Sequence, residues 1–326
     1  MPRPSLTLEV RPAGLYLPAL DLYLDPSRDV PRAFVSHAHG DHDGGFASGT
    51  VLGSRETLAL LAARHGALAG GMAVEEALEM ATPAGMARVS LAPAGHVLGA
   101  SQLVVDHPGG RFVYTGDYRT GGGRTHAAGA PVACDTLAIE STFALPIFRW
   151  PDREATLNAL VEWCRDGDAL VLAYAHGKSQ EIIRALTDAG LEVVAHGAVF
   201  KMCEAYEALG VHVGPVRAYA EEKKRKKSGG VLVAPPRAAA QLSKGRRVAY
   251  VSGNAMVDAQ VDRYRADAAF VLSDHADFDD LVATVRASGA GFVYTTHGDA
   301  VPFARYLVEQ GIHAEARELG ALDEEA

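Results

Sequence analysis

Residues 36–42 read Ser36-His37-Ala38-His39-Gly40-Asp41-His42 and directly follow the apolar segment Ala33–Val35. Three histidines and a carboxylate so close together cannot all be packing groups, because each would need its own buried partner. At the end of a strand, the first two histidines can face one metal ion while Asp41 and His42 face a second. Imidazole and carboxylate ligands favour zinc, and manganese is the usual competitor at sites richer in oxygen. The stretch therefore predicts a metal-binding loop; a polar turn without chemistry is the alternative.

Three further segments offer ligands where apolar runs end. They contain His96 in Gly95-His96-Val97, Asp117 in Thr115-Gly116-Asp117 and His297 in Thr296-His297-Gly298-Asp299. A side chain at a strand exit beside glycine is well placed to reach an active site. Each segment alone is a weak signal, but their common placement predicts that they join the loop at one centre. The remaining histidines considered have no such context and are expected to be surface or structural residues: His65, His107, His126, His212 and His313.

Roughly the first 140 residues have the pattern of short strands joined by turns. His107-Pro108-Gly109-Gly110 has the composition of a hairpin turn. Ser54 can cap a helix that follows it, with Leu58, Leu61 and Ala62 on one face. The strands expected here are residues 22–24, 33–36, 103–106 and 111–114.

From Trp150 onward, helices and strands alternate, which predicts βαβ units and a parallel sheet. The chain is therefore expected to be α/β. The run Glu221–Lys227 is the one charged tract and reads as an exposed loop, with contact to a nucleic-acid backbone as the alternative. The expected helices are residues 153–164, 179–189 and 200–209, and the expected strands are 169–174, 192–195, 231–234, 247–252, 268–273 and 291–296.

The bulk composition is that of a globular protein: 326 residues, 48% hydrophobic and 22% charged. No apolar run reaches the ~18 residues of a membrane span, and the N-terminus lacks a signal-peptide pattern. Three scattered cysteines, Cys134, Cys164 and Cys203, predict reduced buried thiols and a cytoplasmic location. The net charge of −9 weakens the case for a nucleic-acid partner without excluding it. A cleft can be locally positive, and two bound divalent ions would add positive charge.

Taken together, the loop and the strand-end residues resemble the metallo-β-lactamase superfamily, whose HxHxDH signature matches His37 to His42. The resemblance implies an αββα sandwich and two divalent ions, zinc favoured over manganese. Asp25, in Leu24-Asp25-Pro26, matches an early aspartate that orients ligands. The resemblance implies a first ion held by His37, His39 and His96, a second held by Asp41, His42 and His297, and Asp117 bridging both.

Further segments resemble the β-CASP nucleases within this superfamily. Ile139-Glu140-Ser141-Thr142-Phe143 matches the first signature of that branch, Leu272–Asp277 around His275 the second, and His297 the third. Gly177-Lys178-Ser179-Gln180-Glu181 matches a motif that the branch carries at a helix start. The resemblance implies a metallo-β-lactamase domain in two parts, residues 1–148 and 266–326, with an inserted α/β β-CASP cap domain at residues 149–265.

Within that branch, the chain is most similar to bacterial ligase-associated DNA exonucleases, on Thr142–Pro146, Arg149–Pro151, His196–Val199 and Ser273–Asp277. One departure is Ser252-Gly253-Asn254-Ala255-Met256, where the subgroup commonly has Ser-Gly-Trp-Met. The resemblance implies a cytoplasmic exonuclease for single-stranded or resected DNA in repair, associated with a DNA ligase or helicase. Histidine at position 297 is more typical of RNA-processing members, so RNA processing is the main alternative. A small-molecule hydrolase and a non-catalytic binding subunit are further alternatives.

One helix start offers candidate contacts to substrate. Gly177-Lys178-Ser179 is not a P-loop, because Leu172 stands where that motif needs glycine. The helix N-terminus could still bind a phosphate, with a simple helix start equally compatible. Lys178 and Ser179, with Ser141 beside Glu140, are the candidate substrate-binding residues.

The expected chemistry is two-metal hydrolysis of a phosphodiester, in which the ions supply the nucleophile and stabilise the leaving oxygen. Asp117 would hold the ions together. His275 would contact the scissile phosphate or protonate the leaving oxygen, and Glu140 would orient that imidazole. Asp25, Asp117, Glu140 and His275 are thus the candidate catalytic residues.

Overall fold

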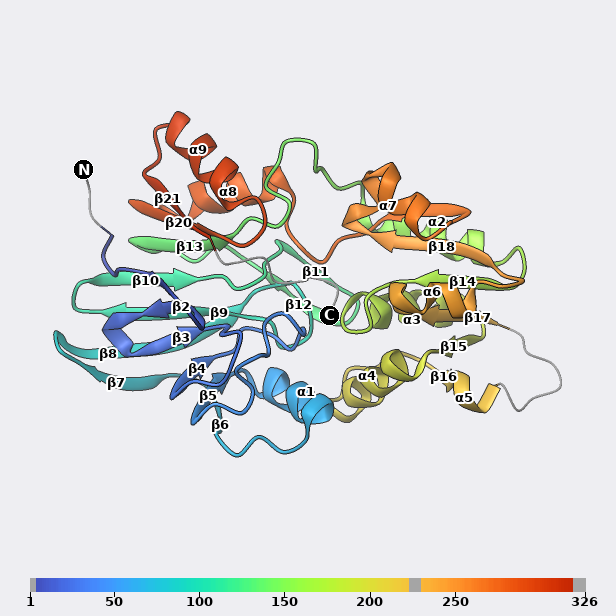
Figure 1. The fold of residues 1–326 in the computed structure, drawn as a ribbon, viewed down its shortest axis with the longest axis horizontal. Coiled ribbons are helices and arrows are strands. Elements are labelled where there is room, and N and C mark those ends of the chain that lie inside the picture. The colour runs from blue at the N-terminus through green and yellow to red at the C-terminus, as the bar shows by residue number, and fades with distance from the viewer. Residues whose placement is uncertain (1–3, 223–229, 319–326) are drawn as a thin grey trace. The chain divides into compact units, whose positions relative to one another are not determined.

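The computed structural model describes residues 4–222 and 230–318. The fold is mixed α/β, and the chain divides into two compact units (Figure 1). Unit 1 comprises Met1–Gly122, His126–Arg149 and His275–Ala326. Unit 2 comprises Gly123–Thr125 and Trp150–Asp274.

The first sheet of unit 1 begins with antiparallel strands and continues with parallel ones. Its order is β1-β2-β3-β4-β5-β6, and the pairing changes to parallel between β3 and β4. Val35 extends β4 by one more bond, from its N–H to the Leu52 carbonyl at 2.9 Å. The strands are β1 (Glu9–Arg11), β2 (Gly14–Leu17), β3 (Leu22–Leu24), β4 (Arg32–Phe34), β5 (Thr50–Gly53) and β6 (Gly71–Ala73).

The second sheet of unit 1 has the order β21-β20-β13-β10-β9-β8-β7. β8 and β10 both pair antiparallel with β9, and β10, β13 and β20 pair parallel to one another. These four strands therefore run in the same direction, and their carboxyl ends meet at one edge. The strands are β7 (Leu78–Thr82), β8 (Gly85–Pro93), β9 (Ser101–His107), β10 (Gly110–Tyr114), β13 (Thr136–Glu140), β20 (Phe292–Thr296) and β21 (Ala314–Arg317), with a separate pair, β11 (Gly121–Gly123) and β12 (His126–Gly129).

Two apolar clusters organise the layers of unit 1. Side chains alternate between the faces of a strand, so Leu103 and Val105 of β9 point one way and Val104 the other. Leu103 and Val105 belong to a cluster that includes Leu24 and Phe34 of the first sheet. Val104 joins the cluster formed with helices α8 (Phe278–Ser288) and α9 (Ala300–Glu309). The two sheets thus pack face to face, with α8 and α9 on the outer face of the second sheet (Figure 1).

Helix α1 (Arg55–His65) lies beside the carboxyl end of β5 (Figure 1). Its N-cap is Ser54, whose side chain accepts a hydrogen bond from the Thr57 N–H. This cap satisfies an amide that would otherwise lack a partner at the helix start. The predicted cap is confirmed.

Unit 2 contains a parallel sheet in the order β16-β15-β17-β14-β18-β19, as the alternating pattern predicts. Leu170 and Leu172 of β14 belong to an apolar cluster with residues of α6 and α7. Val171 between them points to the opposite face. The strands are β14 (Ala169–Leu172), β15 (Val193–Ala195), β16 (Val216–Ala218), β17 (Val231–Ala234), β18 (Arg247–Ser252) and β19 (Ala268–Val271), and the helices are α2 (Arg153–Cys164), α3 (Lys178–Asp188), α4 (Gly197–Ala208), α5 (Tyr219–Glu222), α6 (Ala239–Leu242) and α7 (Asp258–Arg263).

Several local predictions are confirmed, and some need correction. The hairpin turn between β9 and β10 forms, with His107 opposite Gly110. The strand expected at residues 33–36 ends at Phe34, and the one expected at 268–273 ends at Val271. Glu221 lies in α5, not in a loop, because the chain makes a short helix after β16. The basic run of residues 223–227 lies outside the described residues.

Cys134, Cys164 and Cys203 are free thiols, as predicted, although Cys134 is only half-buried. Burial raises the pKa of Cys164 and Cys203 to about 12, so these thiols stay protonated near neutral pH. Within residues 4–222 and 230–318, no helix combines the length and apolar character needed to cross a membrane.

Candidate metal centre

The residues of the candidate site follow the carboxyl ends of strands. In the second sheet, His96 follows β8, Asp117 follows β10 and His297 follows β20, while Glu140 is the last residue of β13. Because these four strands run in the same direction, their ends bring the four side chains to one edge. The loop of residues 36–42 follows β4 of the first sheet in the same manner.

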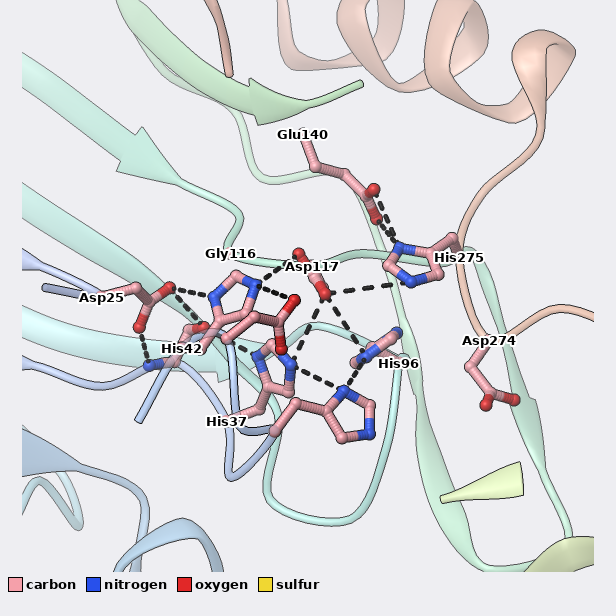
Figure 2. A network of polar contacts seen from close by, with 12 residues as sticks. Asp25, His37, His42, His96, Gly116, Asp117, Glu140, Asp274 and His275 are labelled. Carbon is pink, nitrogen blue, oxygen red and sulfur yellow. Dashed lines mark hydrogen bonds and ion pairs between the residues drawn. The ribbon is translucent and has the colours of Figure 1, made fainter. Parts of the chain in front are cut away.

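Three imidazoles and one carboxylate converge at this edge (Figure 2). The Nδ1 atom of His39 lies 2.9 Å from His37 Nε2 and 3.0 Å from His96 Nε2. Asp117 Oδ2 lies 3.5 Å from His37 Nε2 and 3.6 Å from His96 Nε2. All four ligand atoms lie within 4.8 Å of one another. A close set of imidazole nitrogens and a carboxylate oxygen has the donor chemistry of a divalent transition-metal site.

The other oxygen of the same carboxylate lies beside His42, and Asp41 and His297 are neighbours of that histidine. His42 Nε2 lies 3.2 Å from Asp117 Oδ1 and 3.7 Å from Asp41 Oδ2. The His297 ring stacks on the His42 ring, with their centroids 5.1 Å apart. Asp117 Oδ2 therefore faces His37 and His96, whereas Oδ1 faces His42. This arrangement fits a carboxylate shared between two ions.

Asp25 supports the ligands through a buried network. Its Oδ1 accepts a hydrogen bond from the Ser36 N–H at 2.7 Å. Its Oδ2 accepts from the Ser36 hydroxyl at 2.7 Å and from the Tyr114 hydroxyl at 2.8 Å. The same oxygen lies 3.0 Å from His42 Nδ1, which leaves His42 Nε2 directed toward Asp117 (Figure 2). A carboxylate on the far nitrogen of a ligating histidine fixes the ring and strengthens it as a ligand.

The site has strongly shifted protonation equilibria. Burial lowers the pKa of His37 well below its usual value, and the charge of His42 lowers it further. Burial would lower the pKa of His42 as well, but the carboxylates around it, Asp117 foremost, raise it well above its usual value. Burial would raise the pKa of Asp117, but the surrounding imidazoles hold it well below its usual value. A ligating imidazole is neutral, so a bound ion and a proton would compete for His42.

Glu140 and His275 form a hydrogen-bonded pair beside this centre. The two carboxylate oxygens of Glu140 lie 2.9 and 3.1 Å from His275 Nδ1. Glu140 is fully buried, and one of its oxygens also accepts the Tyr118 N–H at 2.5 Å. The other ring nitrogen, His275 Nε2, lies 3.9 Å from Asp117 Oδ2. Glu140, His275 and Asp117 also place ligand atoms within 4.8 Å of one another, so they form a second candidate group for an ion.

The three candidate substrate-binding residues are all buried. The Ser141 hydroxyl has no hydrogen-bond partner within the described ranges. In unit 2, Lys178 Nζ lies 3.2 Å from Asp274 Oδ2, and the Ser179 hydroxyl donates to the Tyr174 carbonyl at 2.5 Å. The Ser179 N–H at the start of α3 also donates to Tyr174, at 3.3 Å. Their role in substrate binding stays a prediction.

The backbone at the centre adopts conformations that few residues tolerate. Asp25 and His297 have φ values of +43° and +57° without being glycine. Such positions persist only where the surrounding structure imposes them, and they cluster at functional sites. Gly116 has φ +55°, and a Cβ atom there would lie 2.5 Å from the Ser36 side chain. Close packing of the Asp117 segment against Ser36 therefore requires glycine at this position.

Sequence reasoning missed several supporting residues. Ser36 and Tyr114 donate hydrogen bonds to Asp25. Ser36 directly precedes His37, and Tyr114 directly precedes the segment Thr115–Asp117, so their positions beside these motifs could have indicated a supporting role. Arg64 and Asp43 form an ion pair at 3.0 Å beside the loop of residues 36–42. No motif in the sequence marks Arg64.

Comparison with known proteins finds relatives whose sequences are similar over most of this chain or over about a third of it. The "Probable DNA ligase" of Opitutus terrae is 35% identical over 315 residues, which cover 92% of this chain and 30% of that protein. Cleavage and polyadenylation specificity factor subunit 3 of Dictyostelium discoideum is 34% identical over 109 residues, 31% of this chain and 14% of that protein. The chain therefore spans less than a third of the length of either relative. No protein-family model matches it.

One relative is matched over most of its own length. It is the "Uncharacterized protein in lig 3'region" of Acidianus ambivalens, 33% identical over 110 residues, which cover 32% of this chain and 74% of that protein. This chain belongs to the same family as that protein. An RNase J-like protein of Methanocaldococcus jannaschii is also similar, 32% identical over 97 residues, 28% of this chain and 23% of that protein. These relatives are together consistent with the β-CASP metallo-β-lactamase nucleases and imply a metallo-β-lactamase fold.

The fold as a whole has a counterpart among solved structures. A protein of unknown function from Enterococcus faecalis superposes with a TM-score of 0.56 at 15% sequence identity. The match covers 89% of this chain and 79% of that one. At this identity the likeness establishes a shared fold, which hosts many functions.

Gly116→Ala tests the close packing behind the metal centre. We expect the free energy of unfolding to fall by about 1–3 kcal/mol, because the new methyl group meets Ser36 and the backbone conformation becomes strained. Denaturant unfolding in the presence of a chelator measures this change. Gly291→Ala is the matched control in the same unit, since its Cβ would meet only the Asp135 carbonyl at 3.8 Å. Equal stability of the two variants would contradict the packing argument.

Proposed function

We propose that this chain is a two-metal phosphodiesterase that hydrolyses nucleic acid, with DNA as the favoured substrate and exonucleolytic cleavage as the mode. The observation that carries the proposal is the Asp117 carboxylate, whose Oδ2 faces His37 and His96 while its Oδ1 faces His42. A pair of ions that shares one carboxylate suits an in-line displacement at phosphorus, because attacking and leaving oxygens both need stabilisation. The relatives named as nucleic-acid processing proteins support the substrate class.

The proposal includes a division of the chain into two domains. We assign residues 1–148 and 266–326 to an αββα metallo-β-lactamase domain and residues 149–265 to an inserted β-CASP cap. The two face-to-face sheets of unit 1 support the first assignment. The parallel sheet and helices of unit 2 support the second. A cytoplasmic location fits the free thiols.

The ligand assignment follows the two sets of donors. His37, His39 and His96 would hold the first ion, with Asp117 shared. The second ion would be held by Asp41, His42, His297 and the same carboxylate. Zinc suits the imidazole-rich first set, and the additional carboxylate at the second set leaves manganese as a competitor. When bound, the ions supply Lewis-acid stabilisation of negative charge and make water a stronger acid.

His275 is the proposed proton donor to the leaving oxygen. Its Nδ1 is occupied by Glu140, so Nε2 is the atom directed toward the candidate metal ligands. The buried carboxylate stabilises the protonated imidazole and fixes the ring in one orientation. Glu140 thus acts through His275, and Asp25 acts through His42.

DNA is favoured over RNA because the relative that matches 92% of this chain is named as a DNA ligase. That name also supports association with a ligase, and association with a helicase stays a prediction. RNA is the second candidate, supported by the cleavage-factor and RNase J-like relatives.

Digestion of end-labelled oligonucleotides tests the proposal directly. Matched single-stranded DNA and RNA, with 5′-phosphate or 5′-hydroxyl ends, would be incubated with the metal-stripped protein reloaded with zinc or manganese. We expect stepwise shortening of DNA that depends on added metal. Faster cleavage of RNA would favour the second candidate, and intact substrates under every condition would argue against a nuclease.

Asp117→Ala should abolish metal pairing and activity in a folded protein. We expect metal content to fall and cleavage to drop by more than the ~10–100-fold typical of outer-shell changes, because both ions lose a ligand. Metal content by mass spectrometry and cleavage rate at saturating metal are the measurements. Asp166→Ala is the control, since Asp166 is exposed in the turn between α2 and β14. Turnover close to that of the control would rule out the shared carboxylate.

His275→Ala should keep metal content and slow cleavage by about 10²–10⁴-fold, the usual contribution of a general acid. His313→Ala, a change at an exposed histidine in the same unit, is the control. A substrate whose leaving group needs no protonation should restore much of the lost rate. If metal content falls in step with the rate, His275 is a ligand instead.

A further inference from the structure

Helix α1 is bonded at its N-terminal end to one of the two loops that carry the first set of metal ligands. The Ser54 hydroxyl donates to the Gly99 carbonyl at 2.7 Å, and the Thr57 hydroxyl donates to the same oxygen at 2.9 Å. Gly99 lies near the end of the short loop that contains His96. A Cβ atom on Gly99 would lie 2.7 Å from the Thr57 nitrogen, so helix and loop are in close contact.

The C-terminal end of α1 is bonded to the other loop. Arg64 Nη1 donates to the Ala38 carbonyl at 2.5 Å and lies 3.0 Å from Asp43 Oδ2. Ala38 stands between the ligands His37 and His39, and Asp43 directly follows the ligand His42. One guanidinium group therefore holds the ligand loop at two points that flank most of its donors.

The partners of Arg64 are themselves fixed. The Asp43 side chain is 8% exposed, and its Oδ2 also lies 2.6 Å from His65 Nε2. The Phe46 ring stacks on the His65 ring at 4.1 Å with an interplanar angle of 12°. Asp43 thus has two cationic or hydrogen-bonding partners from the last turn of α1, and the carboxylate cannot easily turn away.

We propose that Arg64 is a positioning residue for the metal centre, and that Asp43 and His65 hold it in place. The inference rests on the proposed function, because it assumes that His37, His39 and His96 bind a metal ion. Residues that orient ligands without touching the ion commonly change metal affinity by ~10–100-fold when they are replaced. Arg64 acts on the backbone of the loop, through the Ala38 carbonyl, and so differs from Asp25, which acts on the His42 ring.

Positioning and simple electrostatics predict opposite effects for loss of the Arg64 charge. Removing a cation near a divalent site would by itself tighten binding of the ion. Removing a support of the ligand loop weakens binding, because the loop must then be ordered at the expense of binding free energy. The sign of the change in affinity therefore separates the two roles.

The test is titration of metal-stripped protein with Co²⁺, whose visible absorption reports the ligand geometry. Arg64→Met is the principal variant, and Arg64→Lys retains the charge on a different head group without the guanidinium geometry. Arg55→Met is the matched control, because Arg55 is an exposed arginine on the same helix. Thermal unfolding of each variant in a chelator measures stability without metal.

We expect Arg64→Met to bind Co²⁺ about 10–100-fold more weakly than the wild-type chain with an altered spectrum, and Arg64→Lys to recover part of the loss. The control should match the wild type. Wild-type affinity in a folded Arg64→Met, or tighter binding, would overturn the inference alone. If Arg64→Met does not fold, Arg64→Gln takes its place, and wild-type affinity in that variant would do the same. If the wild-type chain binds no Co²⁺, the proposed metal centre fails as well.

Discussion

The buried carboxylate of Asp25 is the constraint on which the candidate metal centre depends. Asp25 directly follows β3. Its partners are Ser36 in the loop after β4 and Tyr114 in β10 of the other sheet. A buried charge is costly unless hydrogen bonds compensate it. Asp25 is compensated only when Ser36, Tyr114 and His42 occupy their places together. Satisfying this one group therefore fixes how the two sheets of unit 1 meet at the ligand edge.

Hydrogen bonds also link the segment of Asp117 to that of His275, the proposed proton donor. Glu140 accepts the Tyr118 N–H, and the Tyr118 carbonyl accepts the Ala276 N–H at 2.6 Å. Asp117 directly precedes Tyr118 in the chain, and His275 directly precedes Ala276. The distance between Asp117 and the His275 imidazole is thus set in part by a backbone–backbone hydrogen bond, which varies less than a contact between flexible side chains. Tight backbone packing, such as that of Gly116 against Ser36, adds to this rigidity.

Much of the fold was predictable because it depends on local pattern. The parallel sheet of unit 2 followed from alternating helices and strands, and the cap of α1 followed from Ser54. Edges of elements were less certain, since β4 and β19 end earlier than their apolar runs. All strands of the first sheet, β1 to β6, have three or four residues and give almost no periodic signal. Pairing with neighbours far along the chain is what makes them strands.

The sequence by itself determined the types of donor and their order along the chain: three histidines and an aspartate in residues 36–42, then His96, Asp117 and His297. Donor chemistry is a property of residue type and can be read without coordinates. Only the tertiary structure decided that Asp117 directs its two oxygens to different histidines and that Arg64 holds the ligand loop. Both facts depend on strand direction and on contacts between distant segments, and a single sequence carries no record of which distant residues meet.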